Sequence, residues 1–136
     1  MVELAKRPRE QYVPLKDVAE QQQISEKYLE AIVRELVAAE ILDGQRGRGG
    51  GYRLKRSAEA YSAGEVLALV EGDMLPVACM HPGAADCARM NECETLPLWR
   101  DFHTVIKEYF NSISIADLVS GRVGRQAATF CDGGGI

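Results

Sequence analysis

Hydrophobic residues in the first third of the chain recur with the period of a helix. Between residues 29 and 37 they fall at positions i, i+3, i+4, i+7 and i+8, which is one face of an amphipathic helix. Ser25 precedes this run, where its hydroxyl can accept a hydrogen bond from a first-turn N–H group. The pattern predicts a helix that begins after Ser25. Its buried face comprises Leu29, Ile32, Val33, Leu36 and Val37.

Two shorter helices are predicted before this one. Residues 15–22 form a helical pattern, and a short turn separates them from the helix after Ser25. Residues 1–5 resemble the end of another helix, which stops near Pro8 because proline lacks a backbone N–H. The buried side of the 15–22 helix comprises Leu15, Val18 and Ala19.

A glycine-rich segment follows these helices. Residues 41–45 and 52–54 predict two short strands, which the segment Gly47-Arg48-Gly49-Gly50-Gly51 connects. Glycine adopts the positive φ angles that such a tight connection requires. Helices in this order, followed by a hairpin, predict a winged helix-turn-helix. The expected fold class is therefore mainly α with a small β wing.

The second half of the chain contains a long helical pattern with one broad apolar face. Because this face is rich in aromatic residues, it needs a large cover, and a matching helix from a second subunit would provide one. We therefore expect a homodimer. Shorter helices are predicted at residues 62–72 and 114–119, and residues 73–95 are expected to be irregular. The apolar face comprises Trp99, Phe102, Val105, Ile106, Tyr109, Phe110 and Ile113.

Charge is distributed unevenly along the chain. The net charge is −4, but residues 1–56 contain eleven Lys and Arg against nine Asp and Glu, and residues 57–136 contain five against eleven. Residues 46–56 contain five basic residues and no acidic one. A local basic edge attracts phosphates whatever the net charge of the chain. The basic residues of this run are Arg46, Arg48, Arg53, Lys55 and Arg56.

The first turns of the second helix of a helix-turn-helix enter the major groove of DNA. Glu30 could accept a hydrogen bond from a cytosine amino group, or it could pair with Arg34 at i+4 on a solvated face. At the wing, Arg46 and Arg48 could reach a narrow minor groove. A purely solvated hairpin would leave the basic run unexplained. The candidate DNA-binding residues are Ser25, Lys27, Tyr28, Glu30, Arg46 and Arg48.

The cysteines point to a metal or a redox sensor. No membrane-length apolar run and no secretory signal is present, so we expect a cytoplasmic protein with no membrane partner and with reduced thiols. Cys79, Cys87 and Cys93 are spaced C-x7-C-x5-C in a loop rich in Pro, Gly and Asp. This spacing suits an iron–sulfur cluster better than the paired knuckles of structural zinc, but it does not decide the matter. No catalytic constellation is evident, so we do not expect an enzyme.

Three segments together resemble the Rrf2 family of bacterial transcription regulators: Leu15-Lys16-Asp17-Val18-Ala19, Ile24-Ser25-Glu26-Lys27-Tyr28-Leu29-Glu30 and Arg46-Gly47-Arg48-Gly49-Gly50-Gly51-Tyr52-Arg53-Leu54. The resemblance implies a homodimer on palindromic double-stranded DNA. It places Ser25, Lys27, Tyr28 and Glu30 at groove-reading positions and Arg46 at that of the wing arginine. Members usually begin about a dozen residues earlier, so we interpret Met1 as an internal methionine of the first helix.

Members that bind a cluster carry three cysteines in this loop, so the resemblance implies a [2Fe–2S] or [4Fe–4S] cluster on Cys79, Cys87 and Cys93. Where some members carry a histidine as fourth ligand, this chain has Leu96. His81 is the best local replacement. His103 on the long helix suits a structural role, and Cys131 is interpreted as a bystander thiol.

The resulting hypothesis is a regulator that senses iron, redox state or nitric oxide. One alternative keeps the DNA-binding regulator without a cluster, responding through thiols or a small effector. A more distant alternative is an iron–sulfur electron carrier.

These patterns divide the chain into four expected parts. Residues 1–58 form the winged helix-turn-helix DNA-binding domain, and residues 59–95 form a connecting helix and the cysteine sensor loop. Residues 96–120 form the dimerisation helix. Residues 121–136 are expected to be a flexible tail, because they are rich in glycine.

Overall fold

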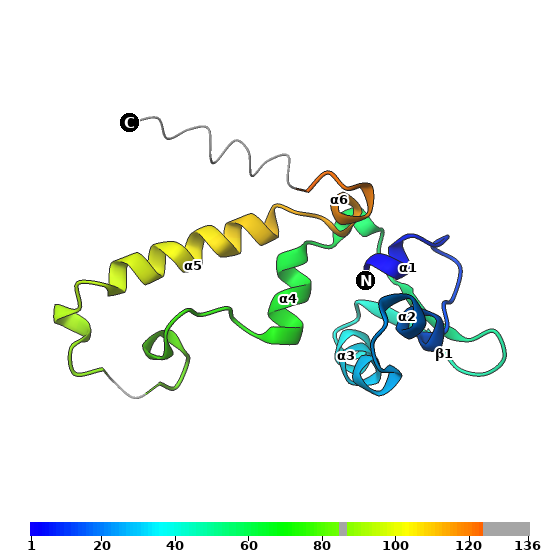
Figure 1. Ribbon diagram of the computed structural model, residues 1–136, viewed down its shortest axis with the longest axis horizontal. Coiled ribbons are helices and arrows are strands. Elements are labelled where there is room, and N and C mark those ends of the chain that lie inside the picture. The colour runs from blue at the N-terminus through cyan, green and yellow to red at the C-terminus, as the bar shows by residue number, and fades with distance from the viewer. Residues whose placement is uncertain (85–86, 124–136) are drawn as a thin grey trace.

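The computed structural model describes residues 1–84 and 87–123, and it has two parts of different shape (Figure 1). Three helices and a hairpin gather at one end of the molecule, and a long helix extends away from them. The tail that was expected to be flexible, including Cys131, falls outside the described residues from 124 onward.

The first part follows the predicted helix boundaries closely. Ser25 is the N-cap of α3, and its hydroxyl accepts a hydrogen bond from the Tyr28 N–H at 3.1 Å. Gln23, the C-cap of α2, adopts a left-handed φ of 54°, which turns the chain toward α3. Val33 and Leu36 of α3 are buried in the core, together with Leu4 of the first helix. The three helices are α1 (Val2–Ala5), α2 (Leu15–Gln22) and α3 (Glu26–Ala38).

The hairpin consists of two antiparallel strands, β1 (Leu42–Gln45) and β2 (Gly51–Leu54). Leu42 pairs with Leu54, and both are buried. The second strand begins at Gly51, one residue earlier than predicted, because Gly51 pairs with Gln45. Outside the hairpin, Val13 forms a bridge with Tyr52, so the segment before α2 adjoins the second strand.

The second part contains the predicted long helix and shorter helices around it. Ile113 was predicted on the long helix, but that helix ends at Asn111. Ile113 instead lies buried in the connection to α6, where its carbonyl accepts a hydrogen bond from the Ala63 N–H at 2.7 Å. The elements are the 3₁₀ turn η1 (Ala58–Ala60), α4 (Ala63–Glu71), the 3₁₀ turns η2 (Ala78–Met80) and η3 (Met90–Glu92), α5 (Leu96–Asn111) and α6 (Ile115–Ser120).

The two parts are joined at Tyr61, whose side chain is fully buried. Its hydroxyl donates to the carbonyl of Ile41 at 2.8 Å and accepts from the Arg56 N–H at 2.8 Å. Its own carbonyl accepts from the Ile115 N–H of α6 at 2.9 Å. One side chain therefore ties the base of the hairpin to the helical part.

The expected fold class is confirmed: the chain is mainly helical and carries a two-stranded antiparallel wing. Within residues 1–84 and 87–123, no helix combines the length and the hydrophobicity that a membrane span requires.

Candidate nucleic-acid interface and cysteine loop

The first turns of α3 present every predicted groove-reading side chain to solvent. Ser25, Lys27, Tyr28 and Glu30 are all exposed, and the Tyr28 side chain is 57% exposed. The Ser25 hydroxyl already accepts the capping bond, so its hydrogen and one lone pair remain for a ligand. An exposed tyrosine beside a lysine is suited to contact both phosphates and bases.

Glu30 and Arg34 are both exposed on α3, one helical turn apart. The ion pairs found among the described residues do not join them. The solvated pair considered for Glu30 is therefore not formed within the part of the chain that the structure covers. Both side chains remain available to a ligand.

The wing tip, residues 46–50, projects away from α5 (Figure 1). Gly47 and Gly49 have φ angles of 92° and 77°, which side-chain-bearing residues rarely adopt. Arg46 and Arg48 are exposed, and neither has a carboxylate partner within the described ranges. The tip therefore carries two guanidinium groups that are available to phosphates.

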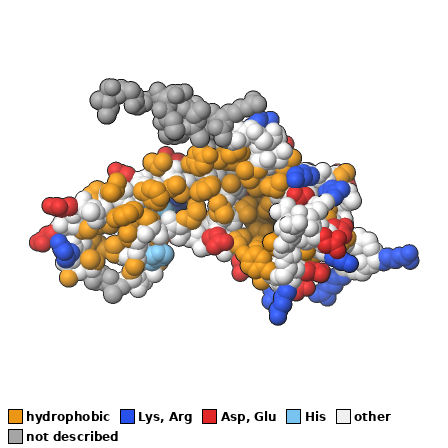
Figure 2. Space-filling view, in the orientation of Figure 1, with side chains coloured by type: hydrophobic (Ala, Val, Ile, Leu, Met, Phe, Trp, Pro, Cys, Tyr) orange, Lys and Arg blue, Asp and Glu red, His pale blue; other side chains and the backbone are white. Residues whose placement is uncertain are grey.

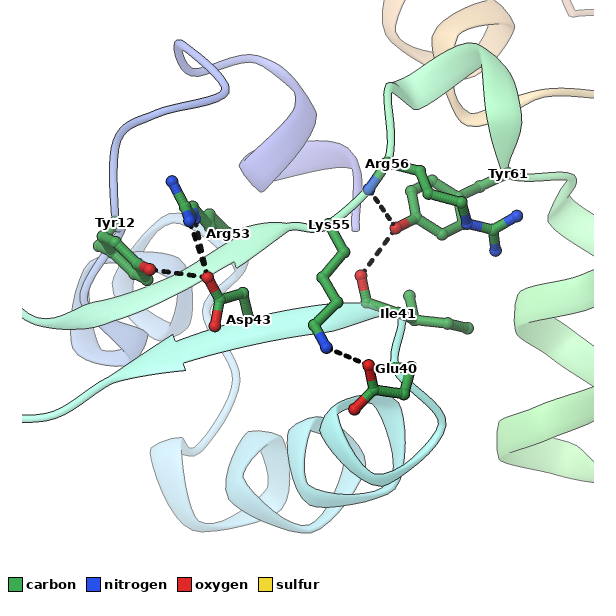
Figure 3. A network of polar contacts seen from close by, with 8 residues as sticks. All are labelled: Tyr12, Glu40, Ile41, Asp43, Arg53, Lys55, Arg56 and Tyr61. Atoms are coloured by element: carbon green, nitrogen blue, oxygen red, sulfur yellow. Dashed lines mark hydrogen bonds and ion pairs between the residues drawn. The ribbon is translucent and has the colours of Figure 1, made fainter.

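The wing base, formed by residues 41–43 and 53–56, differs from the prediction. Although the sequence run from 46 to 56 contains no acid, the fold brings acids to its second half (Figure 3). Arg53 donates to the Asp43 carboxylate from Nε at 3.0 Å and from Nη2 at 2.8 Å, and Tyr12 donates its hydroxyl to the same oxygen at 2.7 Å. Lys55 forms an ion pair with Glu40.

Arg56 is also committed to internal contacts. Its guanidinium pairs with Glu65 of α4, and the guanidinium carbon lies 4.1 Å from the centre of the Tyr61 ring. Of the five basic residues that predicted a DNA-binding edge, only the two at the tip are thus without a partner among the described residues. The sequence run contains no acidic residue, but in the folded chain acids from other segments pair with Arg53, Lys55 and Arg56.

These contacts shift ionisation at the wing base. The Tyr12 hydroxyl, and then the Arg53 guanidinium, lower the pKa of Asp43, because both donate hydrogen bonds to its charged form. The same carboxylate raises the pKa of Tyr12 and of Arg53. Sequence reasoning missed Tyr12 and Asp43, which are 31 residues apart in the chain.

The cysteine loop lies near the start of α5, at the end of the molecule away from the wing (Figure 1). Cys79 and Cys93 are half-buried, Cys87 is exposed, and none of these three forms a disulfide. Within residues 1–84 and 87–123, no three His, Cys, Asp or Glu side chains are gathered closely enough to hold a metal ion. The structure therefore supplies the predicted thiols without bringing them together.

The Cys93 thiol has a side-chain hydrogen-bond partner. Its sulfur lies 3.5 Å from the Thr95 hydroxyl, and this hydrogen bond lowers the pKa of the thiol. Leu96, which occupies the position of the expected fourth ligand, is the first residue of α5 and is buried. His81 is exposed just after η2, and His103 is half-buried on α5. Three soft thiols in one loop match the ligands that iron–sulfur clusters prefer.

Hydrophobic side chains gather along α5 and remain accessible in this single chain (Figure 2). Leu98, Phe102 and Val105 are 62%, 47% and 55% exposed. Phe102 also packs edge-to-face against Trp99, with ring centres 6.3 Å apart. An apolar surface of this kind marks an interaction site.

The chain is similar to known transcription regulators over nearly its whole length. Residues 1–121 match the family described as "Rrf2: Iron-dependent Transcriptional regulator". The HTH-type transcriptional regulator IscR of Vibrio vulnificus strain YJ016 is 37% identical over 120 residues, which cover 88% of this chain and 70% of that protein. IscR of Yersinia pseudotuberculosis is 34% identical over 122 residues, 90% of this chain and 73% of that protein.

Solved structures agree. CymR, the global cysteine regulator of B. subtilis, superposes with a TM-score of 0.68 at 32% identity, covering 88% of this chain and 86% of that one. IscR of T. potens superposes with a TM-score of 0.67 at 26% identity, covering 89% and 78%. These relatives are regulators of transcription and not enzymes, as expected. The chain belongs to the Rrf2 family of helix-turn-helix transcriptional regulators.

Proposed function

We propose that this regulator binds a palindromic site in double-stranded DNA as a homodimer. The first turns of α3 enter the major groove, and the wing tip reaches the adjacent minor groove. The observation that carries this proposal is the wing tip itself, where Arg46 and Arg48 are exposed and the neighbouring Gly47 and Gly49 have positive φ angles. The side chains proposed to contact DNA are Ser25, Lys27, Tyr28, Glu30, Arg46 and Arg48.

The second subunit covers the apolar face of α5. Leu98, Phe102 and Val105 are too exposed for a stable isolated surface, and the same face on a second copy would bury them. A symmetric pair presents two α3 helices to half-sites about 34–36 Å apart, one turn of DNA. The two-fold symmetry of the pair is why we expect a palindromic site.

We propose further that Cys79, Cys87 and Cys93 hold an iron–sulfur cluster, [2Fe–2S] or [4Fe–4S]. The thiol donors fit such a group, and the family is described as iron-dependent. A bound cluster would supply a centre whose occupancy or charge follows iron, oxidants or nitric oxide. Cys93 lies three residues before the start of α5, so a cluster bound to Cys93 would connect the cysteine loop to the helix that we propose forms the dimer.

DNA binding is tested by selecting duplexes from a random library with the purified protein and measuring affinity against salt concentration. The expected result is enrichment of a palindrome bound with a steep salt dependence. Recovery of no duplex at low salt, together with a monomeric mass by sedimentation, would contradict the proposal.

The cluster is tested by anaerobic purification, visible absorption and analysis of iron and sulfide. Cys79→Ser, Cys87→Ser and Cys93→Ser should each abolish the visible absorption, whereas the control Cys131→Ser should retain it. Absence of iron and sulfide from the anaerobic wild type would exclude the cluster.

A second candidate is the same DNA-binding regulator without a cluster. It is favoured by the separation of the three thiols within the described residues, and CymR, a structural relative, is a cysteine regulator. In that case the anaerobic protein is colourless, and thiol oxidation or a small effector still changes its affinity for the selected duplex.

A further inference from the structure

A cleft of about 690 Å³ separates α3 from the hairpin. Glu30, Val33, Arg34 and Val37 line it from the helix side, and residues 44–47 and 50–52 line it from the hairpin side. Pro14 and Leu15, at the start of α2, complete the lining. We call this space the α3–wing cleft.

The two walls of the cleft each carry an arginine. Arg34 stands on the helix wall and Arg46 on the hairpin wall, and both are exposed. Neither has a carboxylate within ion-pair distance in the described part of the chain, although Arg53 and Arg56 nearby are both paired. Glu30 is the carboxylate among the described lining residues, and it lies one turn toward the N-terminus from Arg34.

Backbone contacts hold one end of the cleft together. Val13 and Tyr52 exchange two hydrogen bonds, of 3.0 and 2.9 Å, which hold the start of α2 against the hairpin. Gly51 permits this approach because a Cβ there would lie 2.2 Å from the Val13 carbonyl oxygen. Because Pro14 and Leu15 line the cleft, the positive end of α2 also adjoins it.

A winged helix places its recognition helix in the major groove and its wing in a neighbouring minor groove. One sugar–phosphate strand separates these two grooves, so it must pass between the helix and the wing. We propose that the α3–wing cleft holds this strand and that Arg34 and Arg46 bind its phosphates from opposite sides. This inference rests on the proposed DNA-binding function and adds Arg34 to its contacts.

Arg34 is a phosphate contact and not a base reader. It lies in the third turn of α3, whereas base edges are reached from the N-terminal turns of a recognition helix. A phosphate contact contributes the same affinity on every sequence, and it adds about one unit to the slope of log affinity against log salt concentration.

The test measures binding of the full-length dimer to its selected duplex by fluorescence anisotropy at several salt concentrations. Arg34→Gln should weaken binding about five- to tenfold on the selected duplex and equally on a mismatched one, and lower the salt slope by about one. Arg34→Lys should keep most of the slope, because the charge is retained. Arg100→Gln, an exposed arginine on α5, is the matched control and should bind like the wild type.

A second arm replaces single phosphates of the duplex by neutral methylphosphonates. One or two replacements between the major-groove half-site and the wing contact should weaken the wild type more than Arg34→Gln, since the variant has already lost the Arg34 contact and keeps only that of Arg46. Wild-type affinity and slope in Arg34→Gln would overturn the inference. Loss of discrimination between matched and mismatched duplexes would overturn it too, because Arg34 would then read a base.

Failure of the proposed function gives a different result from failure of this inference alone. If no duplex binds the wild type, both are overturned. If the wild type binds tightly and the Arg34 variants match it, only the cleft proposal is lost. Urea unfolding of each variant checks that the exposed substitutions leave the fold intact.

Discussion

At the tip of the wing, Arg46 and Arg48 extend from glycine backbone into solvent, whereas at its base Arg53 and Arg56 are held by carboxylates and aromatic rings. The two regions share one residue type and one short stretch of sequence. A guanidinium paired with a carboxylate attracts a phosphate less strongly, because the carboxylate neutralises its charge. The base therefore contributes to the fold, and the tip remains available to bind.

The largest expected effect on stability comes from Tyr61, which contacts the wing base. Tyr61→Ala removes a fully buried ring and leaves the Ile41 carbonyl and the Arg56 N–H without partners. The free energy of unfolding should fall by about 3–5 kcal/mol, measured by urea denaturation. Tyr61→Phe, which keeps the ring, should cost about 1–3 kcal/mol. Equal losses for the two variants would show that the hydroxyl, and not the ring, holds the base together.

The next largest effect is a difference in stability between two glycine substitutions in the hairpin. Gly51→Ala places a Cβ 2.2 Å from the Val13 oxygen at a φ of 150°, so we expect a loss of about 2–3 kcal/mol in the free energy of unfolding. Gly47→Ala, at a φ of 92° in open space, is the control and should cost about 1–2 kcal/mol from backbone strain alone. A greater loss of unfolding free energy for Gly47→Ala than for Gly51→Ala would contradict the conclusion that β2 is held by Val13 and that the wing tip lies in open space.

A third substitution tests the tip directly. Arg46→Ala should weaken DNA binding about tenfold and reduce the salt slope by about one, while the free energy of unfolding changes by less than about 0.5 kcal/mol. Arg53→Ala is the matched substitution at the base. This variant should keep the salt slope of the wild type but have a lower free energy of unfolding. If Arg53→Ala reduced the slope as much as Arg46→Ala, the base would also be a DNA contact.

The smallest effect concerns pH. Because hydrogen bonds from Tyr12 and Arg53 lower the pKa of Asp43 in the folded chain, the charged carboxylate stabilises the fold at neutral pH. That stability is present above the ordinary pKa of aspartate, about 3.9, and is lost as the pH falls through the lower folded value. Asp43→Asn should therefore flatten the acid limb of the unfolding free energy below about pH 4, as followed by urea titrations. An unchanged acid limb would argue against this pairing.

Local signals predicted most of the winged region. The bounds of α2 and the cap at Ser25 depend on residues within one or two turns, so periodicity and capping chemistry were sufficient. The fate of the basic run was not predictable, because Arg53 meets Asp43 across a strand pair and Arg56 meets Glu65 across a turn and a helix start. Ile113 was misassigned since it continues the helical spacing beyond the last residue of α5.

The cysteine loop shows the limit of spacing as evidence. C-x7-C-x5-C identified donors of suitable chemistry, but spacing along a chain does not fix distances through space. Arg34 was noticed only as a partner for Glu30, and its position on the wall of the α3–wing cleft depends on how the hairpin packs.

Tyr61 has a consequence for how any signal reaches DNA. Its hydroxyl donates a hydrogen bond to the Ile41 carbonyl, and its own carbonyl accepts one from the Ile115 N–H, so one residue couples the base of the hairpin to the first residue of α6. A displacement of α6 should therefore move the hairpin with it. We therefore expect a signal that moves α6 to change the distance and angle between the two subunits of the proposed dimer and to leave each hairpin unchanged.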